Sequence, residues 1–267
     1  MNILILGTGE IEQKLINLCL KSKLLDRIYT ASSEPLEDIA NVEYNNFDDL
    51  CAKAKALQID LTLVADKSFI QDGIVEFFRS RMLNIISVNK KWFNLESSRI
   101  AAKQLMNYYS INNPDIIKAP VAFPVVIRTS NSTASQIAHT MQELIEIRET
   151  LAGEIVFIED YLEGEIFHET FLWDGKSIVK TPKNVALTEV QEDRLDLFKT
   201  KLSFMLSDEK ADFNGFFTTK LIWAKNDWYV LDFIMHIDKN AWLESPKHDF
   251  LYLLNAVIYQ KLNEIKL

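Results

Sequence analysis

The chain has 267 residues, of which 48% are hydrophobic, enough for one large domain or for two or three small domains with their own cores. Its formal net charge is -9 and its isoelectric point is near 5.1. A field of that sign repels nucleic-acid phosphates and anionic lipids, so we expect neither nucleic acid nor a membrane as a partner. A local basic pocket for a nucleotide remains compatible with this charge.

The two cysteines, Cys19 and Cys51, are too few for a disulfide framework or a four-ligand zinc site. We expect buried, reduced thiols in a cytoplasmic protein. Residues 1–7 lack a basic segment and end in glycine, which predicts a buried strand and not a signal peptide. Because polar side chains interrupt every long apolar stretch, we expect a soluble protein without a transmembrane helix.

Residues 1–90 alternate between short apolar runs and segments of helical periodicity. The pattern predicts strands at 2–6, 27–30, 61–65 and 84–88, and helices from 11 to 25, at 47–57 and at 70–79. Strands that alternate with such helices form parallel sheets with right-handed crossovers. We therefore predict a Rossmann-like N-terminal domain at residues 1–90.

Residues 91–267 show a different pattern, that of an α+β domain with antiparallel strands. A helix at 96–109 ends at Asn112-Asn113-Pro114, where a boundary is expected. Two hairpins turn at Asp174-Gly175-Lys176 and at Lys225-Asn226-Asp227. The other predicted elements are strands at 123–128, 154–159, 167–173, 177–181, 216–223 and 228–233, and helices at 132–150 and 188–206.

The turn Gly7-Thr8-Gly9 between the first strand and the first helix is also found in dinucleotide-binding proteins. Glu12 replaces the third glycine of that fingerprint, and its charge would oppose a pyrophosphate at the helix N-terminus. A tight strand-to-helix turn is therefore the better interpretation, and NAD or FAD binding is disfavoured.

Several segments, in this order of elements, resemble the glycinamide ribonucleotide synthetase (phosphoribosylamine–glycine ligase) family of the ATP-grasp superfamily. Gly7-Thr8-Gly9-Glu10-Ile11-Glu12-Gln13 resembles its opening turn, with Ile11 and Gln13 in place of an Arg and a His. Leu95-Glu96-Ser97-Ser98-Arg99 with Lys103 resembles the helix that begins its ATP-grasp part, where Arg99 stands in place of a Lys. The resemblance implies a Rossmann-like domain followed by an ATP-grasp domain.

The segment Ile158-Glu159-Asp160-Tyr161-Leu162-Glu163-Gly164-Glu165 resembles the hinge of ATP-grasp proteins. A strand end offers backbone N–H and C=O groups to an adenine edge, and a nearby carboxylate can accept hydrogen bonds from ribose hydroxyls. The resemblance implies Glu159 near the adenine amino group, the backbone of Tyr161 and Leu162 along the purine, and Glu165 at the ribose. Asp160 is a further nucleotide-binding residue that it implies. A solvated acidic loop is the structural alternative.

Pro124-Val125-Val126-Ile127-Arg128 resembles the strand that presents a Lys to the ATP phosphates, with Arg128 in the Lys position. A guanidinium binds phosphate through a fork instead of a point charge. Its alternative partner is an acid such as Glu159. Tyr229-Val230-Leu231-Asp232-Phe233-Ile234 resembles the metal strand, where Asp232 can bind magnesium and Ile234, in place of an Asn, cannot.

Three departures from the family concern the phosphates and the chain's extent. Thr129-Ser130-Asn131-Ser132-Thr133-Ala134-Ser135 replaces a glycine-rich phosphate loop and contains no glycine. A long glycine-rich segment in mid-domain is absent near residues 181–184. The C-terminal subdomain is expected to be missing or reduced to residues 246–267, so that the ATP-grasp domain at 91–267 consists of a small subdomain at about 115–165 and a large remainder.

These features support more than one hypothesis on function. The first is an ATP-dependent carboxylate–amine ligase acting through an acyl phosphate, with ATP and magnesium as cofactors and glycine and phosphoribosylamine as the family's substrates. The second is a catalytically impaired relative that binds a nucleotide and acts as an accessory protein. The third is a ligase for another amino acid and amine, because Ile11, Lys67 and His236 alter the substrate side. We expect a monomer or homodimer with small-molecule partners.

Overall fold

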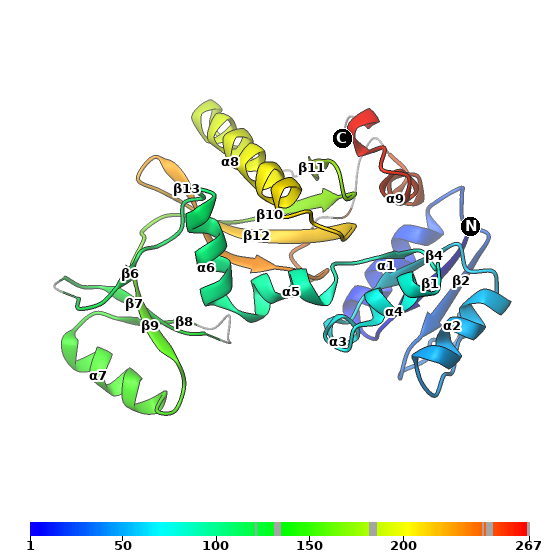
Figure 1. Cartoon of the computed structure of the whole chain (residues 1–267), viewed down its shortest axis with the longest axis horizontal. Helices are drawn as coiled ribbons and strands as arrows, with labels where there is room; N and C mark the ends of the chain where they lie inside the picture. The colour runs from blue at the N-terminus through cyan, green and yellow to red at the C-terminus, as the bar shows by residue number, and fades with distance from the viewer. Residues whose placement is uncertain (121, 131–134, 182–185, 242, 244–247, 266–267) are drawn as a thin grey trace.

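The computed structural model describes the whole chain except residues 121, 131–134, 182–185, 242, 244–247 and 266–267. Its strands form three sheets, which we call the N-terminal, small and large sheets (Figure 1). The N-terminal sheet contains β1 (Asn2–Leu6), β2 (Arg27–Ala31), β3 (Ala40–Asn41), β4 (Leu61–Val64) and β5 (Ile85–Ile86). Its order is β3-β2-β1-β4-β5 and its strands are parallel, as the alternation of strands and helices predicted.

The helices of this first part are α1 (Glu10–Leu20), α2 (Phe47–Ala56), α3 (Lys67–Gln71) and α4 (Ile74–Ser80). The single helix predicted at 70–79 is wrong, because Gly73 separates α3 from α4. Gly73 has a φ of 86°, in the left-handed region that glycine enters without a steric penalty. The strand predicted at 84–88 is shorter than expected, and β3 was not predicted.

The helix predicted at 96–109 is also two helices, α5 (Lys90–Ser97) and α6 (Arg99–Tyr108). Ser98 separates them in an extended conformation, with φ at -132° and ψ at 98°. Its hydroxyl accepts a hydrogen bond from the N–H of Ala101 at 3.4 Å, which caps α6. The break makes Arg99 the first residue of a new helix and sets the direction in which α6 runs.

The small sheet is antiparallel, in the order β6-β9-β7-β8. Its elements are β6 (Ile116–Ile117), β7 (Val125–Thr129), β8 (Ser135–Ala138) and β9 (Val156–Asp160), with helix α7 (Met141–Thr150) against them. The helix predicted from residue 132 is wrong at its start, because 135–138 pairs with β7 instead. Ser and Thr in that stretch favour extended or capping conformations over a helix interior, and α7 begins after the capping residue Thr140.

The large sheet is antiparallel, in the order β11-β10-β12-β13. Its strands are β10 (Ile166–Trp173), β11 (Ile178–Lys180), β12 (Gly215–Ala224) and β13 (Asp227–Ile234), and α8 (Glu189–Asp208) packs on it. The hairpin predicted between β12 and β13 is confirmed. Its turn residues Lys225 and Asn226 have φ values of 52° and 59°, as a two-residue type I′ turn requires.

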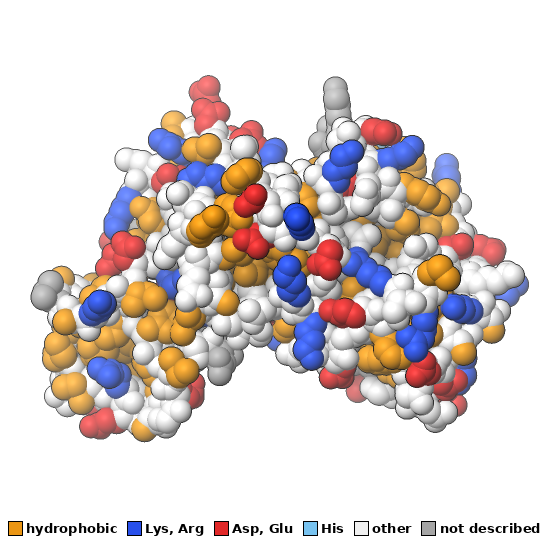
Figure 2. All heavy atoms as spheres, in the orientation of Figure 1, with side chains coloured by type: hydrophobic (Ala, Val, Ile, Leu, Met, Phe, Trp, Pro, Cys, Tyr) orange, Lys and Arg blue, Asp and Glu red, His pale blue; other side chains and the backbone are white. Residues whose placement is uncertain are grey.

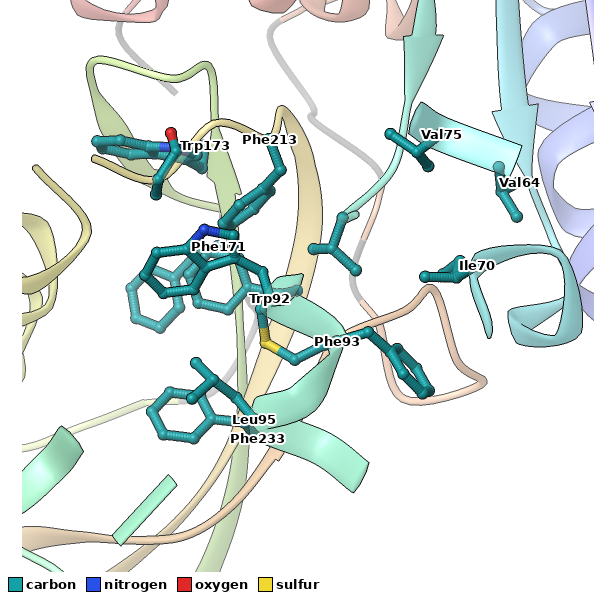
Figure 3. Packing of buried hydrophobic residues seen from close by; sticks show 14 of the residues in the cluster. Val64, Ile70, Val75, Trp92, Phe93, Leu95, Phe171, Trp173, Phe213 and Phe233 are labelled. Atoms are coloured by element: carbon teal, nitrogen blue, oxygen red, sulfur yellow. The ribbon is translucent and has the colours of Figure 1, made fainter. Parts of the chain in front are cut away.

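One apolar core continues from the N-terminal sheet to the large sheet through α5 (Figure 3). Val64 and Ile70 belong to the first part, and Phe171 and Trp173 to the large sheet. Figure 3 shows the α5 side chains Trp92 and Phe93 between the two groups and Leu95 below them, next to Phe233. Large buried side chains contribute about 1.5–3 kcal/mol each, so this shared core couples the parallel sheet to the antiparallel one.

The C-terminal part folds back on the first helix. Helix α9 (Phe250–Ile258) packs in a second apolar core with α1, and a short 3-10 helix follows at Leu262–Glu264. Ser22 donates its hydroxyl to Asp249 Oδ1 at 2.6 Å, and Lys14 Nζ donates to the carbonyl of Ala241 at 2.6 Å. These contacts hold Ala241 and the start of α9 against α1 and the residues that follow it.

The surface of the small sheet and α7 carries exposed hydrophobic side chains, visible at the lower left of Figure 2. They are Ile116, Ile137, Met141, Ile145 and Ile155.

Among the described helices, none combines the length and the apolar character needed to cross a membrane.

We predict that native Cys19 is unreactive. Cys19 has no exposed surface, and burial, with the charge of Asp249 as a smaller cause, raises the pKa of its thiol to about 12. Only the thiolate attacks a disulfide reagent, so the reactive fraction at pH 8 is about one in ten thousand. Ellman's reagent at pH 8 should modify Cys19 at least about a thousandfold more slowly in native protein than in urea, as followed in a Cys51→Ser variant. Rapid native labelling would contradict this burial.

Candidate functional site

A buried carboxylate, that of Glu159 in β9, lies at the centre of the candidate site. Glu159 is 1% exposed. Its Oε2 accepts a hydrogen bond from Arg128 Nε at 2.8 Å, and its Oε1 lies 2.8 Å from Lys103 Nζ, an ion-pair distance. Since a buried charge is costly unless it is paired, these contacts offset the cost of burying all three groups.

The register of the small sheet explains why Arg128 meets Glu159. Val126 of β7 lies opposite Glu159 of β9, and Arg128 follows two residues later. Residues two apart in a strand face the same side of a sheet, so Arg128 reaches Glu159 along the diagonal. The ion pair is therefore set by strand pairing and not by a flexible loop.

Helix α6 supplies two further cations. Arg99 and Lys103 are four residues apart and so share one face of the helix. Lys103 Nζ also donates to Asn113 Oδ1 at 2.9 Å and to the carbonyl of Pro114. Arg99 Nη1 donates to the carbonyl of Leu231 in β13 at 2.8 Å. Helix α6 is thus bound both to the segment that leads into β6 of the small sheet and to β13 of the large sheet.

Asp232 in β13 brings the large sheet into the same network. Its side chain is 8% exposed, and its Oδ1 forms an ion pair with Arg99 Nη2. Its Oδ2 lies 3.6 Å from Arg128 Nη1. Lys220 lies opposite Asp232 in the pairing of β12 with β13. Cations from α6, β7 and β12 therefore surround this one carboxylate.

Burial governs the titration of two groups of the network. The pKa of Asp232 is raised, because burial penalises its charged form more than the charges of Arg99 and Arg128 favour it. The pKa of Lys103 is lowered by burial, and the charge of Glu159 opposes that shift. Each charge in the site thus depends on its partners more strongly than a surface charge does.

The predicted hinge follows Glu159 directly and is packed on the large sheet. A Cβ atom at Gly164 would lie 2.1 Å from the carbonyl oxygen of Trp223, so only glycine fits there. The N–H of Trp223 donates to the carbonyl of Glu165 at 3.1 Å. Leu162 is buried, whereas Tyr161 is 38% exposed. The hinge is therefore a fixed connection between the small and large sheets and not a loose acidic loop.

The predicted site residues Arg99, Arg128, Glu159 and Asp232 come together in one ion-pair network. Their roles toward a nucleotide, like those of Asp160, Tyr161, Leu162 and Glu165, stay predictions. The alternative partner predicted for Arg128, Glu159, is the one observed. The glycine-free segment at 129–135 is described only at its ends, since 131–134 lie outside the described residues.

Sequence reasoning did not include Lys103 among the site residues. The available signal was its spacing, since a cation four residues after Arg99 on the same helix shares its face. Lys220 was missed because only the register of β12 against β13 brings it to Asp232.

A second polar cluster joins α5 to the end of β13. Glu96 accepts hydrogen bonds from the N–H of Met235 at 2.7 Å and interacts with His236 Nδ1 at 2.7 Å. Lys67 Nζ lies 3.5 Å from its other oxygen. Burial opposes the charge of Glu96, but His236 and the other contacts hold its pKa below the usual range. Two of the residues predicted to alter the substrate side, Lys67 and His236, thus share one partner.

The first turn has no such network. Glu12 is 2% exposed at the N-terminus of α1. Burial raises its pKa, and hydrogen bonds from Ser32 and from the Gly9 backbone oppose the shift. Because its carboxylate lies where a pyrophosphate would have to sit, the turn interpretation is favoured over dinucleotide binding.

The residues around Asp232 do not fit a magnesium ion. Magnesium needs several oxygen ligands in octahedral geometry at about 2.1 Å. Both oxygens of Asp232 already face guanidinium nitrogens, and Ile234, on the same side of β13, offers none. Within the ranges that the structure describes, no three His, Cys, Asp or Glu side chains gather as a metal site would require.

Comparison with known proteins gives this arrangement a family context. Residues 1–96 match the family model described as phosphoribosylglycinamide synthetase, N domain. The phosphoribosylamine–glycine ligase of Fusobacterium nucleatum is 25% identical over all of this chain and 75% of its own length. The enzyme of that name from Halalkalibacterium halodurans is 30% identical over 67% of this chain and 48% of its own.

Solved structures of ligases have a similar fold. The phosphoribosylamine–glycine ligase of Thermotoga maritima superposes with a TM-score of 0.72 at 18% identity, over 98% of this chain and 76% of its own. The D-alanine–D-alanine ligase of Bacillus anthracis, solved with ATP, gives 0.63 at 19% identity, over 99% and 98%. The chain is a divergent relative of the phosphoribosylamine–glycine ligases and has the ATP-grasp fold, as predicted.

We predict that Glu159→Gln strongly destabilises the protein. The amide keeps the shape of the side chain but leaves Lys103 and Arg128 without their buried counter-charge. Removing one partner of a buried pair costs about 3–5 kcal/mol, which urea unfolding followed by circular dichroism would measure. The exposed Glu163 supplies the control, because Glu163→Gln should change the free energy of unfolding by less than about 0.5 kcal/mol. Equal stability of both variants would contradict the role assigned to the network.

Proposed function

We propose that this protein binds ATP between the small and large sheets and uses it to join a carboxylate to an amine, as a phosphoribosylamine–glycine ligase does. The observation that carries the proposal is the buried cluster of Arg99, Lys103 and Arg128 beside the hinge. Three buried cations outnumber the two carboxylates between them, Glu159 and Asp232, so the cluster favours an additional anion.

The hinge offers what an adenine needs. Within the described residues, the N–H groups of Tyr161 and Leu162 donate to no other protein group. They stay available to a purine edge, while the packing of Gly164 on Trp223 keeps the segment in place. The exposed carboxylate of Glu165 suits a ribose, because it can accept hydrogen bonds from both hydroxyls.

The proposed reaction has two steps. The substrate carboxylate attacks the γ-phosphorus of ATP, giving an acyl phosphate and ADP, and the amine then attacks the acyl carbon and releases phosphate. The cation cluster would offset the charge that spreads over the phosphoryl oxygens in the first step. Glycine and phosphoribosylamine are the substrates we propose, since the named relatives are ligases for them.

The comparisons do not favour the accessory-protein hypothesis, because the relatives reported above carry the names of ligases. The hypothesis of other substrates rests on Lys67 and His236, which contact Glu96. An assay of ADP release separates these possibilities. We expect ADP release that depends on both glycine and phosphoribosylamine. ADP release that requires another amino acid in place of glycine would support the altered-substrate hypothesis.

We predict that Glu165→Ala weakens the binding of adenosine and ADP. Hydrogen bonds to a charged group are worth about 1.5–3 kcal/mol, so calorimetry should show a Kd at least about tenfold higher. Glu163→Ala is the matched control, because it removes a neighbouring exposed carboxylate of the same hinge. If adenosine and ADP fail to bind the native chain at millimolar concentration, the proposed nucleotide site is wrong.

A further inference from the structure

Asp232, predicted as a magnesium ligand, instead holds two guanidinium groups. Arg99 Nη2 pairs with its Oδ1, and Arg128 Nη1 lies 3.6 Å from its Oδ2. An ion bound to either oxygen would stand within a few ångströms of a fixed positive charge. The repulsion is large in such a buried place, because water screens it poorly.

The same arrangement supplies positive charge without a metal. Arg99, Lys103 and Arg128 carry three charges against the two of Glu159 and Asp232, and Lys220 beside Asp232 adds a fourth cation. The cluster therefore keeps two net positive charges, the amount that one magnesium ion would bring.

Arg128 also keeps hydrogen-bonding capacity. Its Nε donates to Glu159, but its Nη1, although the residue is only 4% exposed, makes no hydrogen bond to any described residue. Its distance of 3.6 Å from Asp232 is too long for one. A buried donor without an acceptor is costly, and a phosphate oxygen would satisfy it.

The ammonium group of Lys103, by contrast, already forms an ion pair with Glu159 and donates to Asn113 and Pro114. It therefore serves to hold Glu159, whereas Nη1 of Arg128 still lacks an acceptor among the described residues. Guanidinium suits a phosphate oxygen as that acceptor, because its fork can contact a carboxylate and a phosphate at once.

We propose that Arg99 and Arg128, held by Asp232, replace magnesium in this protein, so that the diphosphate of a nucleotide binds here without a divalent cation. The inference rests on the nucleotide site proposed above. The proposed function requires only that the nucleotide binds, and the hinge would bind adenosine with or without a metal. The present inference requires in addition that the diphosphate binds without a metal.

Calorimetry on the full chain tests the inference with adenosine and ADP, each in EDTA and in magnesium chloride. We expect ADP to bind with a Kd that differs by less than about threefold between the two conditions, and more tightly than adenosine in both. ADP binding that appears only with magnesium would overturn the inference and leave the proposed function intact. If neither ligand binds in either condition, the nucleotide site itself fails.

Variants separate the arginines from the hinge. Arg128→Gln should weaken ADP at least about tenfold in EDTA and leave adenosine unchanged, whereas the exposed Arg148→Gln should alter neither. ADP binding in EDTA that is unaffected by Arg128→Gln would count against the inference. Circular dichroism checks that each variant is folded.

A second variant guards against loss of folding in the first. Arg99→Lys combined with Arg128→Lys and Ile234→Asn keeps the charges, removes both guanidinium groups from the oxygens of Asp232 and adds an amide oxygen. We expect its ADP binding to become tighter with magnesium by about tenfold or more. If magnesium affects this variant no more than the native chain, the arginines are not what excludes the metal.

Discussion

The buried pairing of Glu159 with Arg128 and Lys103 is the constraint on which the rest of the site depends. It joins a strand of the small sheet, its neighbouring strand and helix α6. Burying three charges is expensive, and the mutual attraction repays the cost only when every partner is in place. The network therefore contributes to which arrangement of strands and helix is adopted more than to net stability.

Asp232 extends that constraint to the large sheet. Because Arg99 and Arg128 reach it from α6 and β7, the two antiparallel sheets are tied together by charge at the site and by the hinge beside it. Gly164 allows the hinge to approach the backbone of Trp223 closely. The apolar core around α5 then connects this unit to the N-terminal sheet, so that Glu96 at the end of α5 meets the end of β13.

Local patterns were sufficient to predict the features that depend on neighbours in sequence. The alternation of strands and helices indicated the parallel sheet, and the turn at Lys225-Asn226-Asp227 indicated a hairpin. The breaks at Gly73 and Ser98 were missed, because each interrupts an otherwise continuous helical pattern with one residue. Strand β8 was taken for helix because its pairing partner, β7, decides its conformation.

The residues of the site likewise fall into those that local sequence motifs predicted and those that only long-range packing brings together. The hinge motif pointed to Glu159 and Glu165, and the chemistry of a buried cation pointed to an acid beside Arg128, which the structure has. The pairing of Asp232 with Arg99 joins residues more than a hundred positions apart, and nothing local to either residue indicates it. Long-range partners of this kind follow from the packing of whole sheets and helices, which a single sequence does not specify in advance.

The arginines and Ile234 are better understood together than one at a time. A lysine at position 99 or 128 would offer a compact point charge, whereas Arg99 and Arg128 each place one guanidinium nitrogen against a different oxygen of Asp232. Because both oxygens of Asp232 face guanidinium groups, no magnesium ion binds there that an oxygen ligand at position 234 could also coordinate. A hydrocarbon side chain there then has no unsatisfied polar atom to bury. Arg99, Arg128 and Ile234 are thus mutually consistent in charge and in hydrogen bonding.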